Sequence, residues 1–238
     1  MTLAIVDCRI SESCERGLEK RGFHVIRMPA NERLGEAVSS HPDMLMLSHG
    51  KHIITNAAYC DTGAYAFTEI RELCPDVSIR FADDEMMAKY PHDAIYNALI
   101  MGDKIFCREA TVSPAVLEYA EDHGLKVINV NQGYPACTVL ALSDTSAITA
   151  DEGMARVLRQ SGISVTVIRN GDISLPPYEY DFIGGAAGVH NGHAYFLGNL
   201  DTHRDADAIK AACDLAKVSP VSLSDEELVD LGRIIFIE

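Results

Sequence analysis

Cys137 is the residue of this sequence whose surroundings best suit nucleophilic chemistry. It follows a Gly-Tyr-Pro turn (133–135) and precedes Thr138 and Val139, whose branched side chains favour the start of a β-strand. A thiol at the mouth of a strand can attack a trigonal carbon when a neighbouring cation or imidazolium lowers its pKa. The alternative is a small, buried apolar side chain, a frequent role for a free cysteine.

His92 and Asp93 follow a second Tyr-Pro pair (90–91), which matches the Tyr-Pro pair just before Cys137. A carboxylate at position 93 can accept two N–H groups of a planar cation in a bidentate contact. An imidazole at position 92 can protonate a departing amine, because histidine titrates near neutral pH. The alternative is a histidine that caps a strand beside an aspartate in a solvated turn.

Asp181 is the candidate for a second carboxylate at the same site, because it begins another strand-like run, 181–189. A surface strand start is the alternative. The glycine-rich run 184–188 lacks the G-x-G-x-x-G spacing and precedes a turn and a strand rather than a helix, so it does not predict a dinucleotide site. Small residues there either leave room for a ligand or let strands pack closely.

The charge balance of the chain favours a cationic ligand. Its 238 residues include 20 Lys and Arg against 35 Asp and Glu, which gives a formal net charge of −15. This field repels nucleic acid and anionic lipid and attracts cations. The sequence contains no 18-residue apolar run and begins without a basic leader, so we expect a cytoplasmic protein with no membrane segment.

The cysteine and histidine spacings do not predict a metal site or another cofactor. None of the seven cysteines forms a C-x-x-C pair, and we expect reduced thiols. Two H-x-x-H pairs, 49–52 and 190–193, fall at predicted hairpin turns. A metal site would need a further carboxylate or histidine beside them, so we interpret both pairs as exposed turn histidines.

Five amphipathic helices are predicted, and each is followed by a short β-rich run. The third helix is the clearest, because Ser113 can cap it, Pro114 suits its first turn and Gly124 ends it. The helices are expected at 11–21, 63–74, 113–123, 151–161 and 205–217, and the β-rich runs at 23–28, 77–82, 125–130, 163–168 and 218–223.

An additional hairpin is predicted between successive helices, and it decides the fold class. The fifth hairpin pairs 231–237 with 3–7, so that the two ends of the chain close a ring. The other four hairpins pair 43–47 with 53–54, 94–100 with 104–107, 137–142 with 147–150, and 181–189 with 193–197.

The repeated unit is therefore strand–turn–strand–helix–strand, at roughly 48 residues a unit, a period typical of circular arrays. The prediction is a single domain over residues 1–238, a five-bladed α/β propeller of ββαβ units with pseudo-fivefold symmetry. A Rossmann-like sheet is the alternative, and it would require the predicted hairpins to be loops.

This repeat resembles the pentein superfamily, the fold of guanidino-group-modifying enzymes such as arginine and agmatine deiminases, dimethylarginine hydrolases and amidinotransferases. The run 90–105 is similar to the family's R-D…G-D…I strand pair, with His92 in place of the arginine. The run 133–140 is similar to the segment that places a nucleophilic cysteine at the start of a strand facing the pore. The resemblance covers nearly the whole chain, and the chain is most similar to an uncharacterised bacterial branch.

The resemblance implies a Cys-dependent hydrolase or transferase that acts on a cationic, arginine-like guanidino or amidino compound without a cofactor. It implies that Cys137 is the nucleophile and His92 the general acid or base, and that Asp93, Asp181 and Asn97 bind the substrate. The sequence does not decide whether the protein forms a homodimer.

One departure from the family pattern supports a different function. Agmatine-deiminase-like members end a glycine-rich strand in His-Cys, and the comparable pair here is His190-Asn191. If that were the nucleophile's position, this chain has lost it. The alternative function is therefore a pentein-fold binding protein without a catalytic constellation.

Overall fold

Small sheets and short helices alternate along the whole chain. The computed structural model describes residues 1–175, 177–178 and 181–238. Within these residues it is a mixed α/β structure with five three-stranded sheets and one two-stranded sheet, none of which closes on itself.

The five three-stranded sheets share one topology, in which the middle strand pairs antiparallel with one neighbour and parallel with the other. In chain order they are β17(Ile235–Ile237)–β1(Leu3–Asp7)–β2(His24–Met28), β3(Met46–His49)–β4(His52–Asn56)–β5(Ser78–Ala82), β6(Leu99–Met101)–β7(Lys104–Cys107)–β8(Lys126–Asn129), β9(Val139–Ser143)–β10(Ser146–Thr149)–β11(Ser164–Val167) and β13(Ala187–His190)–β14(His193–Phe196)–β15(Ser219–Ser222).

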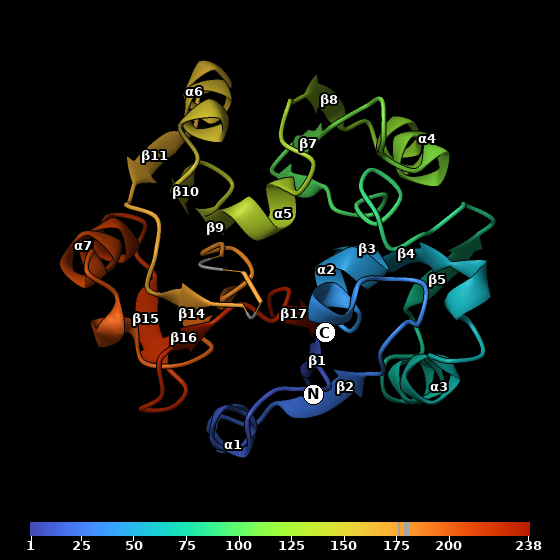
Figure 1. Cartoon of the computed structure of the whole chain (residues 1–238), viewed down its shortest axis with the longest axis horizontal. Helices are drawn as coiled ribbons and strands as arrows, with labels where there is room; N and C mark the ends of the chain where they lie inside the picture. Colours follow the sequence, from blue (N-terminus) through green and yellow to red (C-terminus); the bar gives the residue numbers. More distant parts are fainter. Residues whose placement is uncertain (176, 179–180) are drawn as a thin grey trace.

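One helix connects the two parallel strands of each of these sheets, and the five helices lie at the outer edge of the molecule (Figure 1). All five helices and the β-runs that follow them are confirmed. Ser11, Ser113 and Asp151 accept hydrogen bonds from backbone N–H groups in the first turn of their helices, as N-caps do. The helices are α1(Glu12–Glu19), α3(Ala64–Leu73), α4(Pro114–Asp122), α6(Glu152–Gln160) and α7(Ala206–Leu215).

The two ends of the chain belong to the same sheet. β1 lies between β2 and β17, and its antiparallel register with β17 pairs Leu3 with Ile237 and Ile5 with Ile235. The predicted pairing of the first and last strands is confirmed. The first strands of neighbouring sheets also contact one another in chain order: β6 contacts β9, β9 contacts β13 and β13 contacts β17.

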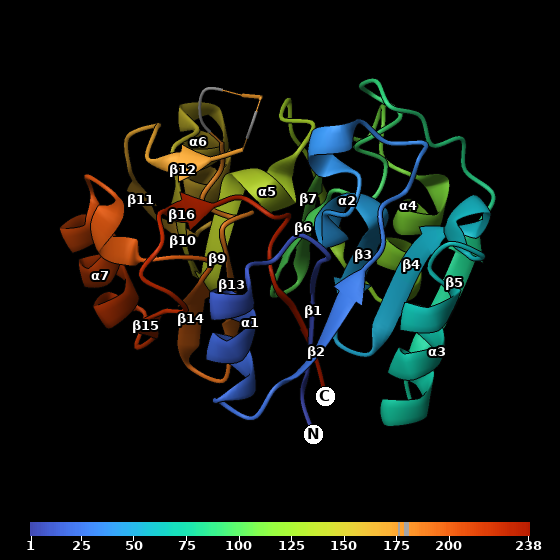
Figure 2. The same cartoon turned by 60° about the horizontal axis from the view of Figure 1, so that its bottom comes forward.

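Short elements fill the end of the molecule opposite the termini, where α2, α5, β12 and β16 lie together (Figure 2). β12 and β16 form the two-stranded parallel sheet. These elements are α2(Pro42–Leu45), α5(Pro135–Thr138), β12(Ile173–Ser174) and β16(Leu228–Val229), and the 3₁₀ helices are η1(Glu36–Val38), η2(Ala57–Tyr59) and η3(Leu200–Thr202).

The first strand of each sheet begins later than predicted. The strands expected from 43 and from 137 begin with the short helices α2 and α5 instead, because Pro42 and Pro135 suit the first turn of a helix. The strands expected from 94, 181 and 231 begin at Leu99, Ala187 and Ile235, and turns or irregular backbone precede them. The candidate site residues therefore lie in the segments before the strands, not in them.

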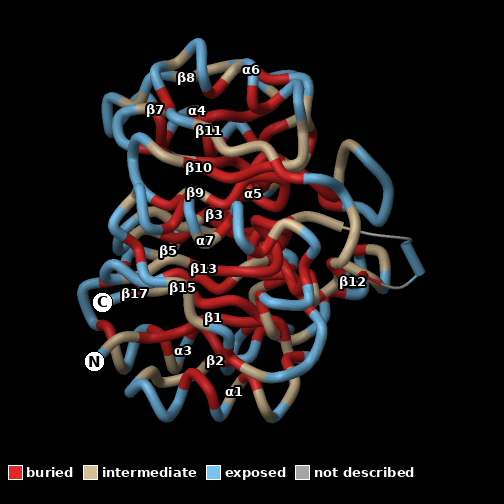
Figure 3. The backbone as a smooth tube through the Cα atoms, turned by 90° about the vertical axis from the view of Figure 1, so that its left-hand side faces the viewer, coloured by how far each residue is buried: buried red, intermediate tan, exposed pale blue. Residues whose placement is uncertain are grey.

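The glycine-rich run 184–188 lies where backbones pack against each other. A Cβ added at Gly184 would lie 2.4 Å from the carbonyl oxygen of Cys137, and one at Gly188 would lie 2.4 Å from that of Ile234. The interpretation that small residues let strands pack closely is confirmed. Burial follows the same pattern, with the strands buried and the outer turns of the helices exposed (Figure 3).

The described helices include none with the length and apolar character that a bilayer-spanning segment needs.

Replacing Ile5 by alanine tests the contribution of the terminal strand pair to stability. Ile5 is fully buried opposite Ile235, so the truncation should lower the free energy of unfolding by about 2–5 kcal/mol in urea denaturation. The control, Leu215→Ala, removes a side chain that is 86% exposed and should change stability by less than about 0.5 kcal/mol. Equal effects of the two substitutions would contradict the closure of the chain through β1 and β17.

Candidate active site

The segments before the first strands each bring one polar side chain toward the middle of the molecule. Asp43 lies on α2 before β3, Asn97 before β6 and Cys137 on α5 before β9. Asp181 precedes β13 and Asp230 precedes β17. The repeated topology of the sheets therefore gathers residues that are far apart in the sequence.

The Cys137 thiol is held by two polar partners. It donates a hydrogen bond to Asp43 Oδ2 at 2.9 Å, and it lies 3.0 Å from Asn97 Nδ2, which donates to it. The Asn97 side chain also donates to the Asp43 carbonyl oxygen and accepts from the backbone N–H of Ala136 at 2.8 Å. Asn97 thus fixes α5 and α2 relative to each other and orients the sulfur.

Burial and neighbouring carboxylates keep the Cys137 thiol protonated. Burial raises its pKa well above the usual value of a thiol, and the charges of Asp43 and Asp230 raise it further. Burial also raises the pKa of Asp43 to about 6, although the hydrogen bond from Cys137 and the positive charge of Arg233 lower it. At neutral pH the pair is a thiol beside a carboxylate.

The carboxyl groups of Asp181 and Asp230 influence each other's ionisation. Burial raises the pKa of both, and the charge of Asp181 raises that of Asp230 further. Asp230, which is 1% exposed, also accepts from the backbone N–H groups of Phe182 and Gly232. One proton between the two carboxyl groups relieves the repulsion of adjacent buried charges.

Asp93 has one carboxylate oxygen bonded and the other without a partner. Tyr134 donates its phenolic hydrogen to Asp93 Oδ2 at 2.9 Å, whereas Asp93 Oδ1 is buried and has no hydrogen-bond partner in the structure. Burial is the main reason that the pKa of Asp93 is raised. A buried acceptor of this kind calls for a donor from a ligand or from water.

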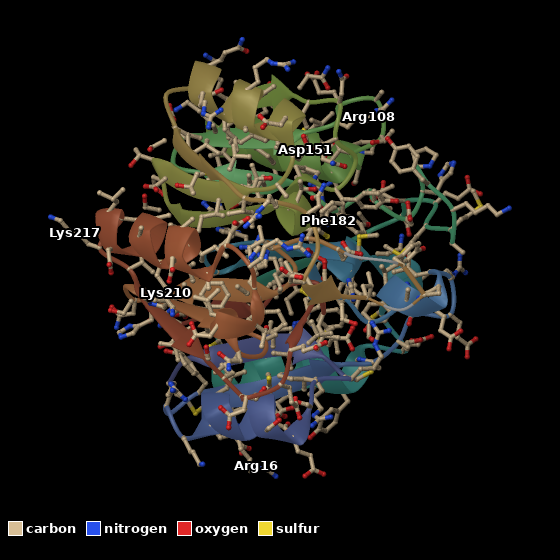
Figure 4. The ribbon with its side chains drawn as sticks, turned by 60° about the vertical axis from the view of Figure 1, so that its left-hand side comes forward. Arg16, Arg108, Asp151, Phe182, Lys210 and Lys217 are labelled. Carbon is tan, nitrogen blue, oxygen red and sulfur yellow. The ribbon has the colours of Figure 1, made fainter. Side chains whose placement is uncertain are left out.

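A cavity of about 590 Å³ connects these groups. Cys137, Asp93, Asp181 and Asp230 line it, together with apolar side chains. One of these is Phe182, which lies in the middle of the molecule, whereas Arg16 and Lys217 lie at its outer edge (Figure 4).

Neither lysine nor arginine is present among the cavity-lining residues in the described part of the chain. The one lining side chain that could carry a positive charge is His41, and burial lowers its pKa to about 4. It lies 3.8 Å from both Asp7 and Asp230, and Asp7 is already paired with Arg9. His41 is therefore neutral at neutral pH, and the cavity is acidic.

The structure brings four of the five predicted site residues together. Cys137, Asp93 and Asp181 line the cavity, and Asn97 contacts the Cys137 sulfur. His92 is half-buried and is not among the residues that line the cavity, so its predicted role as an acid or base stays a prediction.

Asp43, Asp230, His41 and Tyr134 belong to the site but were not predicted. The sequence holds a signal for Asp43, since Pro42-Asp43 precedes β3 much as Pro135 precedes Cys137 and β9. Asp230 precedes a turn glycine, Gly232, whose N–H it accepts, but this pattern is too common to mark a site. His41 carries no distinguishing sequence signal, whereas Tyr134 belongs to the Tyr-Pro pair that precedes Cys137.

The H-x-x-H pairs lie away from this cavity. His49 bonds to the Tyr119 hydroxyl at 2.9 Å, and His190 lies 3.2 Å from a Glu238 carboxylate oxygen. Among the described residues, no three His, Cys, Asp or Glu side chains are arranged to hold a metal ion.

A family model described as "Family of unknown function (DUF6873)" matches residues 5–235 of the chain. The chain belongs to this family. No curated protein matches the DUF6873 chain by sequence.

Solved structures share the fold of the DUF6873 chain at low sequence identity. An amidinotransferase of saxitoxin biosynthesis from Microseira wollei is 11% identical with a TM-score of 0.54, over 93% of this chain and 88% of that one. DDAH from Pseudomonas aeruginosa is 10% identical with a TM-score of 0.58, over 94% and 91%. Agmatine deiminase from C. jejuni is 7% identical with a TM-score of 0.57, over 93% and 87%. These proteins have the pentein fold, so the predicted resemblance is confirmed at the level of the fold.

Replacing Asn97 by alanine tests its structural role at the site. Loss of its four hydrogen bonds leaves the Ala136 N–H without a partner, which should lower the free energy of unfolding by about 2–4 kcal/mol. Chemical denaturation measures this, and the exposed Asn131→Ala is the matched control, with an expected change below about 0.5 kcal/mol. An Asn97→Ala protein as stable as the control would contradict the bridging role of Asn97.

Proposed function

We propose that this chain is a five-bladed α/β propeller, one domain over residues 1–238, that binds a guanidino or amidino cation in its central cavity. In this proposal Cys137 attacks the central carbon of the bound cation. One observation carries the proposal: a thiol and four acidic side chains (Glu36, Asp93, Asp181 and Asp230) line a single cavity whose described lining includes no lysine or arginine.

The repeated topology supports the propeller. Five sheets with the same strand order each carry one helix at the outer edge, and the last strand pairs with the first (Figure 1). In such a ring the segments before the first strands meet at the axis, which is the arrangement that would place Asp43, Asn97, Cys137, Asp181 and Asp230 around one centre.

The unsatisfied carboxylates support a cationic ligand with several N–H donors. A guanidinium group has donors in a fixed planar arrangement that suits carboxylate oxygens. Asp93 Oδ1, which is buried and has no partner, would accept one of these donors, and Asp181 and Asp230 would accept others after losing their shared proton. The apolar wall formed by Met44, Phe182 and their neighbours suits an alkyl chain.

The structurally similar proteins support the same class of ligand. DDAH in the P. aeruginosa structure is a cysteine-to-serine variant complexed with citrulline, and a cysteine-to-serine variant of the C. jejuni agmatine deiminase has its substrate bound. In each of these structures a cysteine is replaced by serine and a small molecule is bound. A cysteine at the cavity of the present chain is consistent with related chemistry.

The proposed attack transfers the thiol proton before or as the carbon–sulfur bond forms. The S–H bond of Cys137 breaks, the proton passes along the existing hydrogen bond to Asp43 Oδ2, and the sulfur lone pair adds to the guanidinium carbon. A C–N bond then breaks, an amine or ammonia takes up a proton and leaves, and an S-alkylthiouronium remains on Cys137. Water converts it to a urea and restores the thiol, or an acceptor amine takes the amidino group.

The bound cation supplies the positive charge that lowers the pKa of the Cys137 thiol. Without ligand, buried carboxylates raise the pKa of the Cys137 thiol and keep it neutral. A guanidinium ion held between those carboxylates offsets their charge and stabilises the thiolate, so the nucleophile forms when the substrate is present. His92 remains the predicted acid for the departing amine, and a movement that brings it to the cavity would be required.

The second candidate function is binding without chemistry. The protonated, buried thiol favours it, because no cation beside the sulfur lowers its pKa in the described structure. The two functions differ in one result: both predict binding of a guanidinium compound by a Cys137→Ala protein, but only the enzyme loses turnover by that substitution.

Replacing Cys137 by alanine tests the nucleophile. The variant should lose turnover of guanidino compounds, measured as ammonia release or amidino transfer, and should keep its unfolding midpoint. Chloroacetamidine, a cationic alkylating reagent, should label Cys137 in the folded wild-type protein, read by peptide mass spectrometry. Cys213→Ala, which removes a buried thiol of α7, is the control and should keep both properties. Labelling of Cys137 only after unfolding would contradict the proposal.

Calorimetry with the Cys137→Ala protein and an alkylguanidinium salt tests the cation site. Binding should release protons, because the bound cation favours ionisation of Asp181 and Asp230, whose pKa values are raised in the free protein. The observed enthalpy should therefore depend on the ionisation enthalpy of the buffer.

Asp93→Asn in the same background should weaken binding about tenfold to a hundredfold, since a charged hydrogen bond is lost. Asp225→Asn, at an exposed position, makes the same change of charge and should not alter the affinity. Equal affinities of the two variants would remove Asp93 from the site.

A further inference from the structure

A second, smaller cavity lies on the other side of the Cys137–Asp43 pair. It has a volume of about 180 Å³ and follows the first strands of three sheets, with Ser48 of β3, His190 of β13 and Phe236 of β17 in its lining. We call it the rear cavity. It extends from Asp43 to the exposed turn residue Gly50, between β3 and β4.

The hydrogen-bonded side chains of Asp43 and Cys137 lie between the two cavities. Cys137 lines the cavity of about 590 Å³, which we call the front cavity, but not the rear one, whereas Asp43 lines the rear cavity but not the front one. Their hydrogen bond joins Sγ to Asp43 Oδ2. A proton that leaves the sulfur through this bond therefore moves away from the substrate side.

Two buried polar atoms in the lining of the rear cavity have no hydrogen-bond partner among the described residues. Asp43 Oδ1 belongs to a side chain that is 97% buried, and Arg233 Nε is buried beside the same space. Buried polar groups without protein partners are normally satisfied by water. A cavity of about 180 Å³ has room for several water molecules, each of which needs about 30 Å³ in the liquid.

The titratable and polar groups around Asp43 come from four segments of the chain. The Cys137 thiol faces it from α5, Arg233 and Asp230 from the segment before β17, and Asp181 from the segment before β13. Asn97 contributes a neutral amide from the segment before β6. Arg233 is the one positive charge in this set, and it lines the rear cavity.

We propose that the rear cavity is a water-filled proton route for the thiol of Cys137, with Asp43 as the proton acceptor and Arg233 as its positioning residue. The proposal rests on the proposed function, in which Cys137 acts as a nucleophile. It adds a second access from solvent to the reacting pair, on the face opposite the substrate.

The proton balance of the route is simple. The S–H bond of Cys137 breaks and an O–H bond forms at Asp43 Oδ2. Rotation of the carboxyl group about its Cβ–Cγ bond brings this O–H to the rear cavity, where a water molecule takes the proton and carries it to solvent. Asp43 is again a carboxylate, and Arg233 and the water at Oδ1 stabilise that form.

Alkylation of Cys137 by iodoacetamide tests the route without a substrate. The rate at position 137 is measured by peptide mass spectrometry from pH 5 to 10. Arg233→Gln removes the positive charge and should move the midpoint of the pH profile upward by about one unit, so that alkylation near neutral pH slows on the order of tenfold. Arg233→Lys restores the charge and should return the midpoint toward that of the wild type.

Ser48→Leu tests the water itself. The larger apolar side chain displaces water from the rear cavity but leaves Arg233 in place, and it should move the midpoint in the same direction. Arg16→Gln, on the exposed face of α1, is the matched control for the loss of an arginine and should leave the profile unchanged. Thermal unfolding identifies variants that are folded, and Ser48→Leu keeps the test available if Arg233→Gln does not fold.

Wild-type profiles for both folded Arg233→Gln and folded Ser48→Leu would overturn the proton route. This result would leave the proposed function intact, because alkylation needs no guanidino compound. Conversely, shifted profiles in a protein that never releases ammonia or transfers an amidino group would overturn the proposed function and keep the route from Cys137 to the rear cavity.

Discussion

Burial of several carboxyl groups around a cavity whose described lining includes no lysine or arginine is the constraint on which the middle of this molecule depends. Asp43, Asp93 and Asp230 are almost fully removed from water, and Asp181 is close to them. Desolvation opposes their ionisation, so protons are held where ordinary aspartates would have lost them. Burial of such groups lowers the free energy of unfolding at neutral pH, and a bound cation would raise it again.

The repeated sheets make this concentration of charge possible. In four of the five three-stranded sheets the first strand contacts the first strand of a neighbour, and the residues just before the first strands come from every part of the chain. Gly184 and Gly185 lie against the segments that carry Cys137 and Asp230, since Gly185 donates to the Cys137 carbonyl and accepts from the Arg233 N–H. The backbone, more than the side chains, therefore sets the distances between the acidic groups.

The elements could be predicted from the sequence better than the site. Ser113, Pro114 and Gly124 mark the ends of a helix through local chemistry, and the other four helices carry similar signals, so their positions were predicted within one or two residues. Cys137 and Asp93 were recognised from the Tyr-Pro pairs beside them. Asp43 and Asp230 could not be recognised from the local sequence, because their roles come from contacts with residues far away in the chain. Cys137 lies 94 positions after Asp43, and Asp181 lies 49 positions before Asp230.

The position of β1 in its sheet has a consequence for synthesis on the ribosome. β1 is made first, but its antiparallel partner β17 is made last, so the edge of β1 stays open until residues 235–237 have emerged. Pairing across nearly the full length of the chain is slow, because the loop that must close is long. Asp230 and Arg233 arrive with the same final segment. A nascent chain therefore holds most of its helices and sheets before it holds any complete pocket, and chaperones that shield strand edges would act on it throughout that interval.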